Sequence, residues 1–82
     1  MGYGEFVEYC VKGLVANPEA VDIEVIEEGD AYVVRIKTDP EDVGKVIGKN
    51  GRLITAIRSI VSAAAEKKGE KAFVKVLTDS DE

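Results

Sequence analysis

The sequence predicts an α+β domain in which a three-stranded mixed sheet carries three helices on one face. The length of 82 residues and the hydrophobic content of 45% suit one small globular domain. Apolar residues recur with helical and strand spacing in the order α-β-β-α-α-β. We assign residues 1–78 to this single domain and expect the acidic tail, residues 79–82, to be frayed.

The first half of the chain predicts a helix followed by a hairpin. From Tyr3 to Ala16 apolar residues recur at spacings of three and four, and the Asn17-Pro18 pair ends the pattern. Residues 21–25 alternate apolar and acidic side chains, as a half-buried strand does. A turn at residues 28–30 joins this strand to a second alternating run, residues 31–37, so we expect a β-hairpin.

The second half predicts two helices and a last strand. Asp39 can cap a helix and Pro40 suits its first position, and this short helix ends at Gly48. A longer helix is predicted over 52–68, and Gly69 ends it. The centre of its apolar face is predicted to consist of Leu53, Ile57, Ile60 and Ala64. Residues 72–77 are rich in β-formers. Because two helices separate this strand from 31–37, we expect the two to pair in parallel through a right-handed crossover.

The composition excludes several kinds of chemistry. With no His and one Cys, the chain cannot build a zinc site of the usual ligand type or a Ser-His or Cys-His nucleophile. The lone Cys10 cannot form an internal disulfide, which fits a reducing compartment. No apolar run reaches about 18 residues, and the first residues lack a secretion signal. We therefore expect a cytoplasmic protein with no membrane span, catalytic residue, metal or cofactor.

Charge is distributed unevenly along the chain. Residues 1–42 hold three basic and eleven acidic side chains, whereas residues 43–75 hold eight basic and two acidic ones, a net charge of +6. The protein as a whole carries −5, which is unusual for a nucleic-acid binder. Local potential rather than net charge attracts an anion within a screening length of about 8 Å. The basic third therefore remains a candidate anion-binding surface.

A four-residue loop with Gly at both ends joins the two predicted helices. Ile47 precedes Gly48-Lys49-Asn50-Gly51, and Ile54 follows three residues after the second Gly. This segment resembles the signature of KH domains, and the order of elements resembles the type II arrangement found in bacteria. The chain as a whole resembles the KhpA family of small bacterial KH proteins. The resemblance implies a Gly-x-x-Gly loop that clamps about four nucleotides of single-stranded RNA.

The residue chemistry supports that reading independently. Glycines lack a Cβ, so the loop can take unusual torsions and a nucleic-acid backbone can approach it closely. The loop leads into the N-terminus of the predicted helix 52–68, where free amides and the helix dipole favour phosphate. We expect Ile47 and Ile54 to form the floor of an apolar groove for bases, with strand 31–37 as its opposite wall. The predicted RNA-binding residues are Lys45, Ile47, Gly48, Lys49, Asn50, Gly51, Arg52, Ile54, Lys67, Lys68 and Lys71.

Arg58 is predicted to be peripheral to this site. The groove would lack an aromatic platform, because all the aromatic residues are predicted to be core or edge residues: Tyr3, Phe6, Tyr9, Tyr32 and Phe73. We therefore expect weak binding of low sequence specificity, driven by phosphate contacts and apolar packing. Simple helix caps would be an alternative role for the two glycines, and no Walker A or dinucleotide-binding motif competes for the loop.

A second function class remains open. A domain with so small a core gains stability by burying surface in an oligomer, and residues 62–65 together with Ala56 and Ala63 offer a small-residue surface. The rival hypothesis is therefore a protein interaction module in which RNA binding is secondary or lost. The family resemblance implies both: self-association as a homodimer, a larger KhpB-like partner, and RNA chaperone activity with effects on cell elongation, division and envelope homeostasis.

Overall fold

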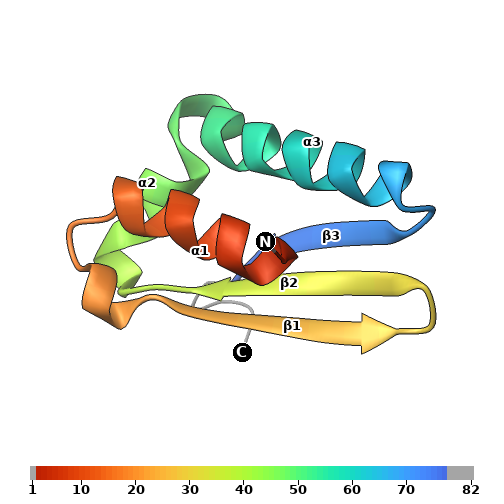
Figure 1. Cartoon of the computed structure of the whole chain (residues 1–82). Helices are drawn as coiled ribbons and strands as arrows, with labels where there is room; N and C mark the ends of the chain where they lie inside the picture. Colours follow the sequence, from red (N-terminus) through yellow and green to blue (C-terminus); the bar gives the residue numbers. More distant parts are fainter. Residues whose placement is uncertain (1, 78–82) are drawn as a thin grey trace.

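The structure is a computed structural model that describes residues 2–77. Its order is α-β-β-α-α-β, as predicted, with three short 3-10 turns added (Figure 1). The helices are α1 (Tyr3–Leu14), α2 (Val43–Ile47) and α3 (Arg52–Lys67), and the strands are β1 (Asp22–Glu28), β2 (Ala31–Lys37) and β3 (Lys71–Val76). The 3-10 turns are η1 (Pro18–Ala20), η2 (Pro40–Asp42) and η3 (Lys49–Gly51). The predicted tail, residues 79–82, lies outside the described residues.

The sheet has the order β1-β2-β3, so β2 is its central strand. β1 pairs with β2 antiparallel as the predicted hairpin, and β2 pairs with β3 in parallel. All three helices lie on one face of this sheet, and α1 and α3 run side by side across it (Figure 1). Asp22 and Glu24 are exposed on β1, as the alternating pattern predicts.

Local chemistry sets the ends of the elements. α1 ends two residues earlier than predicted, and Pro18 opens a 3-10 turn before β1. The predicted cap is confirmed, since the Asp39 carboxylate accepts a hydrogen bond from the Glu41 amide at 2.9 Å, with Pro40 at the first position of the turn. Gly69 follows α3 with φ of +74°, a left-handed conformation that costs glycine little.

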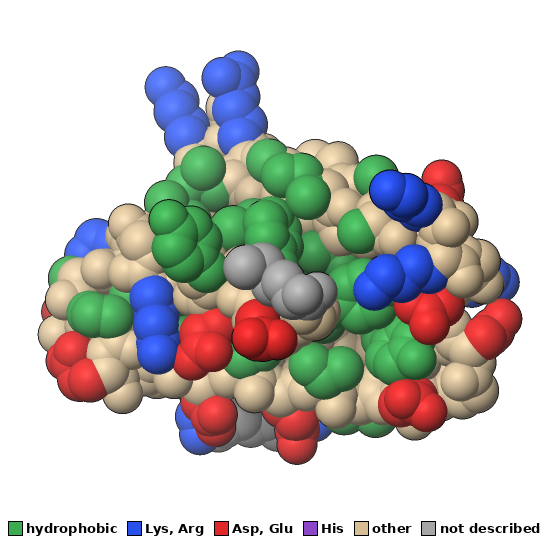
Figure 2. All heavy atoms as spheres, in the orientation of Figure 1, with side chains coloured by type: hydrophobic (Ala, Val, Ile, Leu, Met, Phe, Trp, Pro, Cys, Tyr) green, Lys and Arg blue, Asp and Glu red, His purple; other side chains and the backbone are tan. Residues whose placement is uncertain are grey.

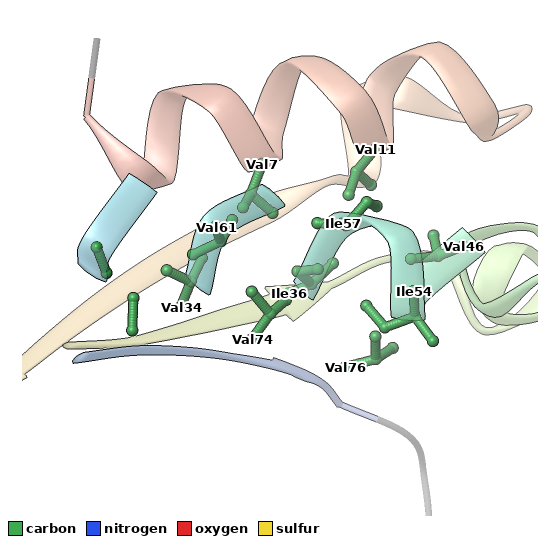
Figure 3. Close-up of a cluster of buried hydrophobic side chains, with 12 residues drawn as sticks. Val7, Val11, Val34, Ile36, Val46, Ile54, Ile57, Val61, Val74 and Val76 are labelled. Carbon is green, nitrogen blue, oxygen red and sulfur yellow. The ribbon is translucent and has the colours of Figure 1, made fainter. Parts of the chain in front are cut away.

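The core lies between the helices and the sheet and consists of medium-sized aliphatic side chains (Figure 3). Its buried members come from all three helices and from β2 and β3: Val7, Val11, Val34, Ile36, Val46, Ile54, Ile57, Val61, Ala65, Ala72, Val74 and Val76. Burying each larger side chain contributes roughly 1.5–3 kcal/mol. This layer fixes α3 against β3 and thereby the position of the loop that precedes α3.

The predicted centre of the α3 apolar face is wrong. The buried side chains are Ile54, Ile57, Val61 and Ala65, whereas Leu53, Ile60 and Ala64 are exposed. Ile60 exposes 55% of its surface and Leu53 exposes 37%. The helix therefore carries an apolar face on the core and a second apolar strip on the outside.

Candidate nucleic-acid interface

The loop between α2 and α3 has a backbone that few residues tolerate. Gly48, Asn50 and Gly51 have φ of 79°, 58° and 73°, all in the left-handed half of conformational space. Gly48 combines its φ with ψ of 172°, a region that is essentially restricted to glycine. Asn50 is a residue type that accepts the left-handed conformation more readily than most. The sequence Gly-Lys-Asn-Gly thus places permissive residues at the three positions that need them.

The two glycines serve different purposes. A Cβ on Gly48 would lie 2.6 Å from Cγ of Leu53, so the side chain of Leu53 already covers this glycine. A Cβ on Gly51 would meet no atom within 4 Å. Close approach of a nucleic-acid backbone is therefore possible over Gly51, whereas Gly48 is required by the packing of the domain itself. The sequence analysis predicted that both glycines allow RNA to approach, and the structure gives Gly48 a packing role instead.

The loop offers backbone donors to the solvent. The first hydrogen bond of its 3-10 turn runs from the Gly51 amide to the Gly48 carbonyl at 3.1 Å, so the amides of Lys49 and Asn50 precede the hydrogen-bonded part of the turn. α3 begins directly after Gly51, and its positive dipole end faces the same loop. Backbone amides and a helix N-terminus together favour an anionic ligand.

The side chains of the loop add positive charge. Lys49, Asn50 and Arg52 are exposed, and within residues 2–77 neither Lys49 nor Arg52 forms an ion pair. In Figure 2, basic side chains project from the surface where α2 turns into α3. Lys45 differs, because its ammonium group lies 3.2 Å from the Asp42 carboxylate. Of the predicted basic residues near the loop, Lys49 and Arg52 are thus free to meet a phosphate, and Lys45 is already paired.

Asp42 holds the base of the loop-bearing helix. Its buried carboxylate accepts hydrogen bonds from the amides of Asn17 at 3.0 Å and Ala16 at 3.3 Å, as well as from Lys45. Burial alone would raise the pKa of Asp42, but these three donors outweigh it and hold the pKa below its ordinary value. The carboxylate therefore stays charged and ties the segment after α1 to the start of α2.

The groove predicted beside the loop has a different wall. Ile54 is buried in the core and Ile47 is partly buried, so both support the domain. Strand 31–37 is the central strand β2, and the strand that lies at the sheet edge beneath α3 is β3. A groove of about 300 Å³ runs between α3 and this edge, lined by Arg58, Ser62, Ala72, Phe73 and Val74. The predicted wall is wrong: the predicted pairings already made 31–37 the central strand, and it is the edge strand β3 that lies beside the exposed side of α3.

Sequence reasoning missed two residues of this groove. The Nε of Arg58 donates a hydrogen bond to the Val74 carbonyl at 3.0 Å, which attaches α3 to the outer edge of β3. Phe73 is an edge-strand residue that exposes 56% of its surface. The position of an arginine on a polar helix face carries no signal of such a contact. The alternation of β3, with Ala72 and Val74 buried, could have shown that Phe73 faces outward.

The three remaining predicted lysines lie at the far end of α3. Lys67, Lys68 and Lys71 flank the turn after the helix, about 22 Å along its axis from Arg52 at a rise of ~1.5 Å per residue. The Lys68 ammonium sits 5.1 Å from the centre of the Tyr3 ring. The fold therefore separates these lysines from the loop, and they form a second basic group.

Glu70 organises that far end. Its carboxylate accepts hydrogen bonds from the hydroxyl of Tyr3 at 2.6 Å and that of Tyr32 at 3.3 Å, and the two rings lie 5.5 Å apart. The hydrogen bond to Glu70, with some desolvation, raises the pKa of Tyr3 to about 12. A carboxylate among these lysines lowers the attraction of the far end for anions. Within the described chain no three potential metal ligands gather in one place.

A family model described as KhpA/KhpB, KH domain matches residues 4–76. The chain belongs to this KH-domain family. The matched span contains every described helix and strand, except that it begins one residue after the start of α1. It includes the Gly48–Gly51 loop between α2 and α3. The predicted family and fold are confirmed. Within residues 2–77 no helix is both long and apolar enough to span a membrane.

Curated relatives cover this KH domain almost end to end. RNA-binding protein KhpA of Caldanaerobacter subterraneus subsp. tengcongensis is 43% identical over 74 residues, which are 90% of this chain and 99% of the relative. RNA-binding protein KhpA of Clostridium perfringens is 42% identical over 73 residues, 89% of this chain and 97% of the relative. These relatives are named as binding proteins, in agreement with the prediction that the chain is not an enzyme.

Solved structures of Era share the fold. Aquifex aeolicus Era bound to GDP and AlF4⁻ superposes with a TM-score of 0.59 at 19% identity, over 94% of this chain and 31% of Era. Era in complex with MgGDPNP and nucleotides 1506–1542 of 16S ribosomal RNA gives 0.59 at 20% identity, over 96% of this chain and 32% of that one. This chain thus spans about a third of Era, and at such low identity the likeness concerns the fold alone.

Proposed function

We propose that this domain binds single-stranded RNA through the Gly48–Gly51 loop and the N-terminus of α3. The observation that carries the proposal is the open space over Gly51, next to exposed Lys49 and Arg52 and to amides that precede the first hydrogen bond of the turn. A phosphate placed there meets backbone donors, a helix dipole and mobile positive charge together. Relatives of 42–43% identity are named RNA-binding proteins, which supports the same conclusion.

The bases would follow the groove between α3 and the edge of β3. This groove begins within two turns of the loop and is lined by the apolar side chains of Ala72, Phe73 and Val74. Phosphate contacts carry no sequence information, and one such module reads about four nucleotides. Low overall sequence specificity follows. Lys67, Lys68 and Lys71 would contact only an RNA that runs the whole length of α3.

The test reverses the charge of the loop and leaves both glycines in place. Lys49→Asp combined with Asn50→Asp should lower the affinity for a labelled uridine hexanucleotide at least a hundredfold, because two carboxylates then face the phosphate site. Fluorescence anisotropy at several salt concentrations measures the affinity, and the melting temperature should stay within a few degrees, because both side chains are exposed.

A matched control separates the local effect from net charge. Lys12→Asp with Ala20→Asp makes the same change in net charge at exposed positions on α1 and η1, which contribute no residue to the loop or the groove. It should weaken binding less than about threefold, since exposed charges beyond a Debye length are largely screened. Equal losses in the two double variants would contradict the proposed site, and unchanged affinity in the loop variant at low salt would contradict it directly.

A second function is favoured by the outer apolar strip of α3. Leu53, Ala56, Ile60 and Ala63 are exposed and follow one another at spacings of three, four and three residues, which places them in one row along the helix. Small residues in such a row let a second helix approach closely. We include in the proposal that this strip mediates self-association, and pairing with a KhpB-like partner is the further expectation from the family. RNA chaperone activity, a cytoplasmic site of action and effects on bacterial cell shape and envelope belong to the same expectation.

Sizing of the purified protein tests the strip. Light scattering at about 100 µM should give the mass of a dimer, and Ile60→Asp should give a monomer, because a carboxylate in a packed apolar seam is costly. Ser59→Asp, one residue away from the strip, should leave the mass unchanged. A monomeric unmodified protein would remove self-association from the proposal without affecting RNA binding.

A further inference from the structure

A hydrogen bond fixes Arg58 at the mouth of the groove between α3 and β3. Its Nε donates to the Val74 carbonyl at 3.0 Å, so one edge of the guanidinium is used by the sheet. The two terminal nitrogens of the group are left to face a ligand, and within residues 2–77 Arg58 has no carboxylate partner. A planar, oriented pair of donors is suited to bidentate recognition rather than to simple charge neutralisation.

The surroundings of Arg58 suit a base better than a phosphate. The groove of about 300 Å³ is lined by Ala72, Phe73 and Val74 together with Ser62, so most of its wall is apolar. Phe73 lines the rim of the groove, and its ring points to the helix-free face of the sheet, because Ala72 and Val74 on either side of it are buried under α3. Unstacked RNA bases are recognised by packing against side chains and by hydrogen bonds to their edges. Phosphates, in contrast, favour the solvated amides and charges of the loop.

The distance from the loop is that of a neighbouring base. Arg58 lies six residues after Arg52, about 9 Å along the axis of α3. A strand advances at least ~3.4 Å per nucleotide, so a segment of four nucleotides clamped by the loop reaches this position. The site therefore belongs to the same bound strand.

We propose that Arg58 is a specificity-determining residue that selects guanine at one position of the bound RNA, in the groove between α3 and the edge of β3. The two donors of the guanidinium match O6 and N7 of guanine, the commonest specific partner of arginine. The proposal rests on RNA binding by the loop and adds a preferred base to it. One favoured base in about four leaves the overall specificity low.

The experiment compares uridine hexanucleotides that carry a single central G, A or C. The unmodified protein should bind the G-containing oligonucleotide about tenfold more tightly than the A-containing one, as a good bidentate contact provides. Arg58→Lys keeps the charge and a donor for Val74 but loses the planar fork, so the preference should fall below about twofold while the salt dependence stays the same. Arg35→Lys, a matched control on β2 where the arginine pairs with Glu24 outside the loop and the groove, should leave the preference intact.

Each other result has a definite meaning. A loss of affinity in Arg58→Lys that is equal for all oligonucleotides and leaves the guanine preference unchanged shows that Arg58 does not read a base, and it overturns the proposal. Absence of a guanine preference in the unmodified protein overturns it as well. If the unmodified protein binds no oligonucleotide, RNA binding itself fails, which is a different result. Should Arg58→Lys not fold, the NMR signal of the Arg58 Nε in the unmodified protein decides, since it must shift more with the G-containing oligonucleotide than with the A-containing one.

Discussion

The two ends of α3 both carry lysines, yet they offer an anion different environments. At the loop end, Lys49 and Arg52 stand beside left-handed backbone and the helix N-terminus. At the far end, Lys68 lies over the Tyr3 ring and Glu70 places a carboxylate among the cations. A count of basic residues does not distinguish these two ends. The two ends differ in backbone conformation and in the presence of the Glu70 carboxylate.

The sharpest way to break the comparison is to remove the conformation of the loop. Gly48→Ala should destabilise the domain by about 3 kcal/mol, because a Cβ there both strains the backbone and collides with Leu53. Gly69→Ala is the matched change at the far end, with positive φ but open space, and should cost only ~1 kcal/mol. Urea denaturation of both variants measures the difference. Equal costs would mean that the contact with Leu53 does not restrict position 48.

Gly51→Ala and Gly69→Ala together test whether RNA binds at the loop end of α3. The positive φ and open surroundings of Gly51 resemble those of Gly69, so the cost of Gly51→Ala in stability should also be about 1 kcal/mol. The added methyl group would point into the space that we assign to RNA, and affinity for the uridine hexanucleotide should therefore fall for Gly51→Ala alone. A loss of affinity in Gly69→Ala would show that RNA does not distinguish the two ends.

A smaller effect is expected from removing the charges of the far end. Replacing Lys67, Lys68 and Lys71 together by Gln should change the affinity for a hexanucleotide less than about threefold, since these residues lie beyond the reach of four clamped nucleotides. With a uridine 20-mer the loss should be larger and accompanied by a smaller salt slope. Anisotropy titrations of both lengths provide the measurement. A strong loss with the hexanucleotide would place the primary site at the far end.

The fold could be predicted because its signals are local. The alternation of β1 and β2, the cap at Asp39 and the glycine after α3 each report on a few neighbouring residues, and all three are confirmed. The loop of the candidate site was predicted for the same reason. The role of Gly48 was not, because the collision with Leu53 is visible only once the loop has a conformation.

The errors concern orientation between elements. Apolar residues surround much of α3, so periodicity could not decide whether Ile60 or Val61 faces the core. The buried and exposed strips both consist of aliphatic residues, and only packing against β3, α2 and α1 separates them. The predicted groove wall failed although the two predicted pairings already make β2 the central strand, because those pairings do not show which edge of the sheet α3 covers. The hydrogen bond from Arg58 to Val74 depends both on which face of α3 is buried and on which edge of the sheet α3 covers.

The carboxylate of Asp42 has a consequence for the order in which the chain is completed during synthesis. It joins amides that precede it by 25 and 26 residues, so the connection after α1 has no anchor until the start of α2 has left the ribosome. The last strand, β3, pairs along the side of β2 opposite β1, so that side of β2 has no partner strand until residues 71–76 have been made. A nascent chain halted before residue 42 would therefore present the apolar side of α1 to chaperones, and release of the finished polypeptide would end that exposure.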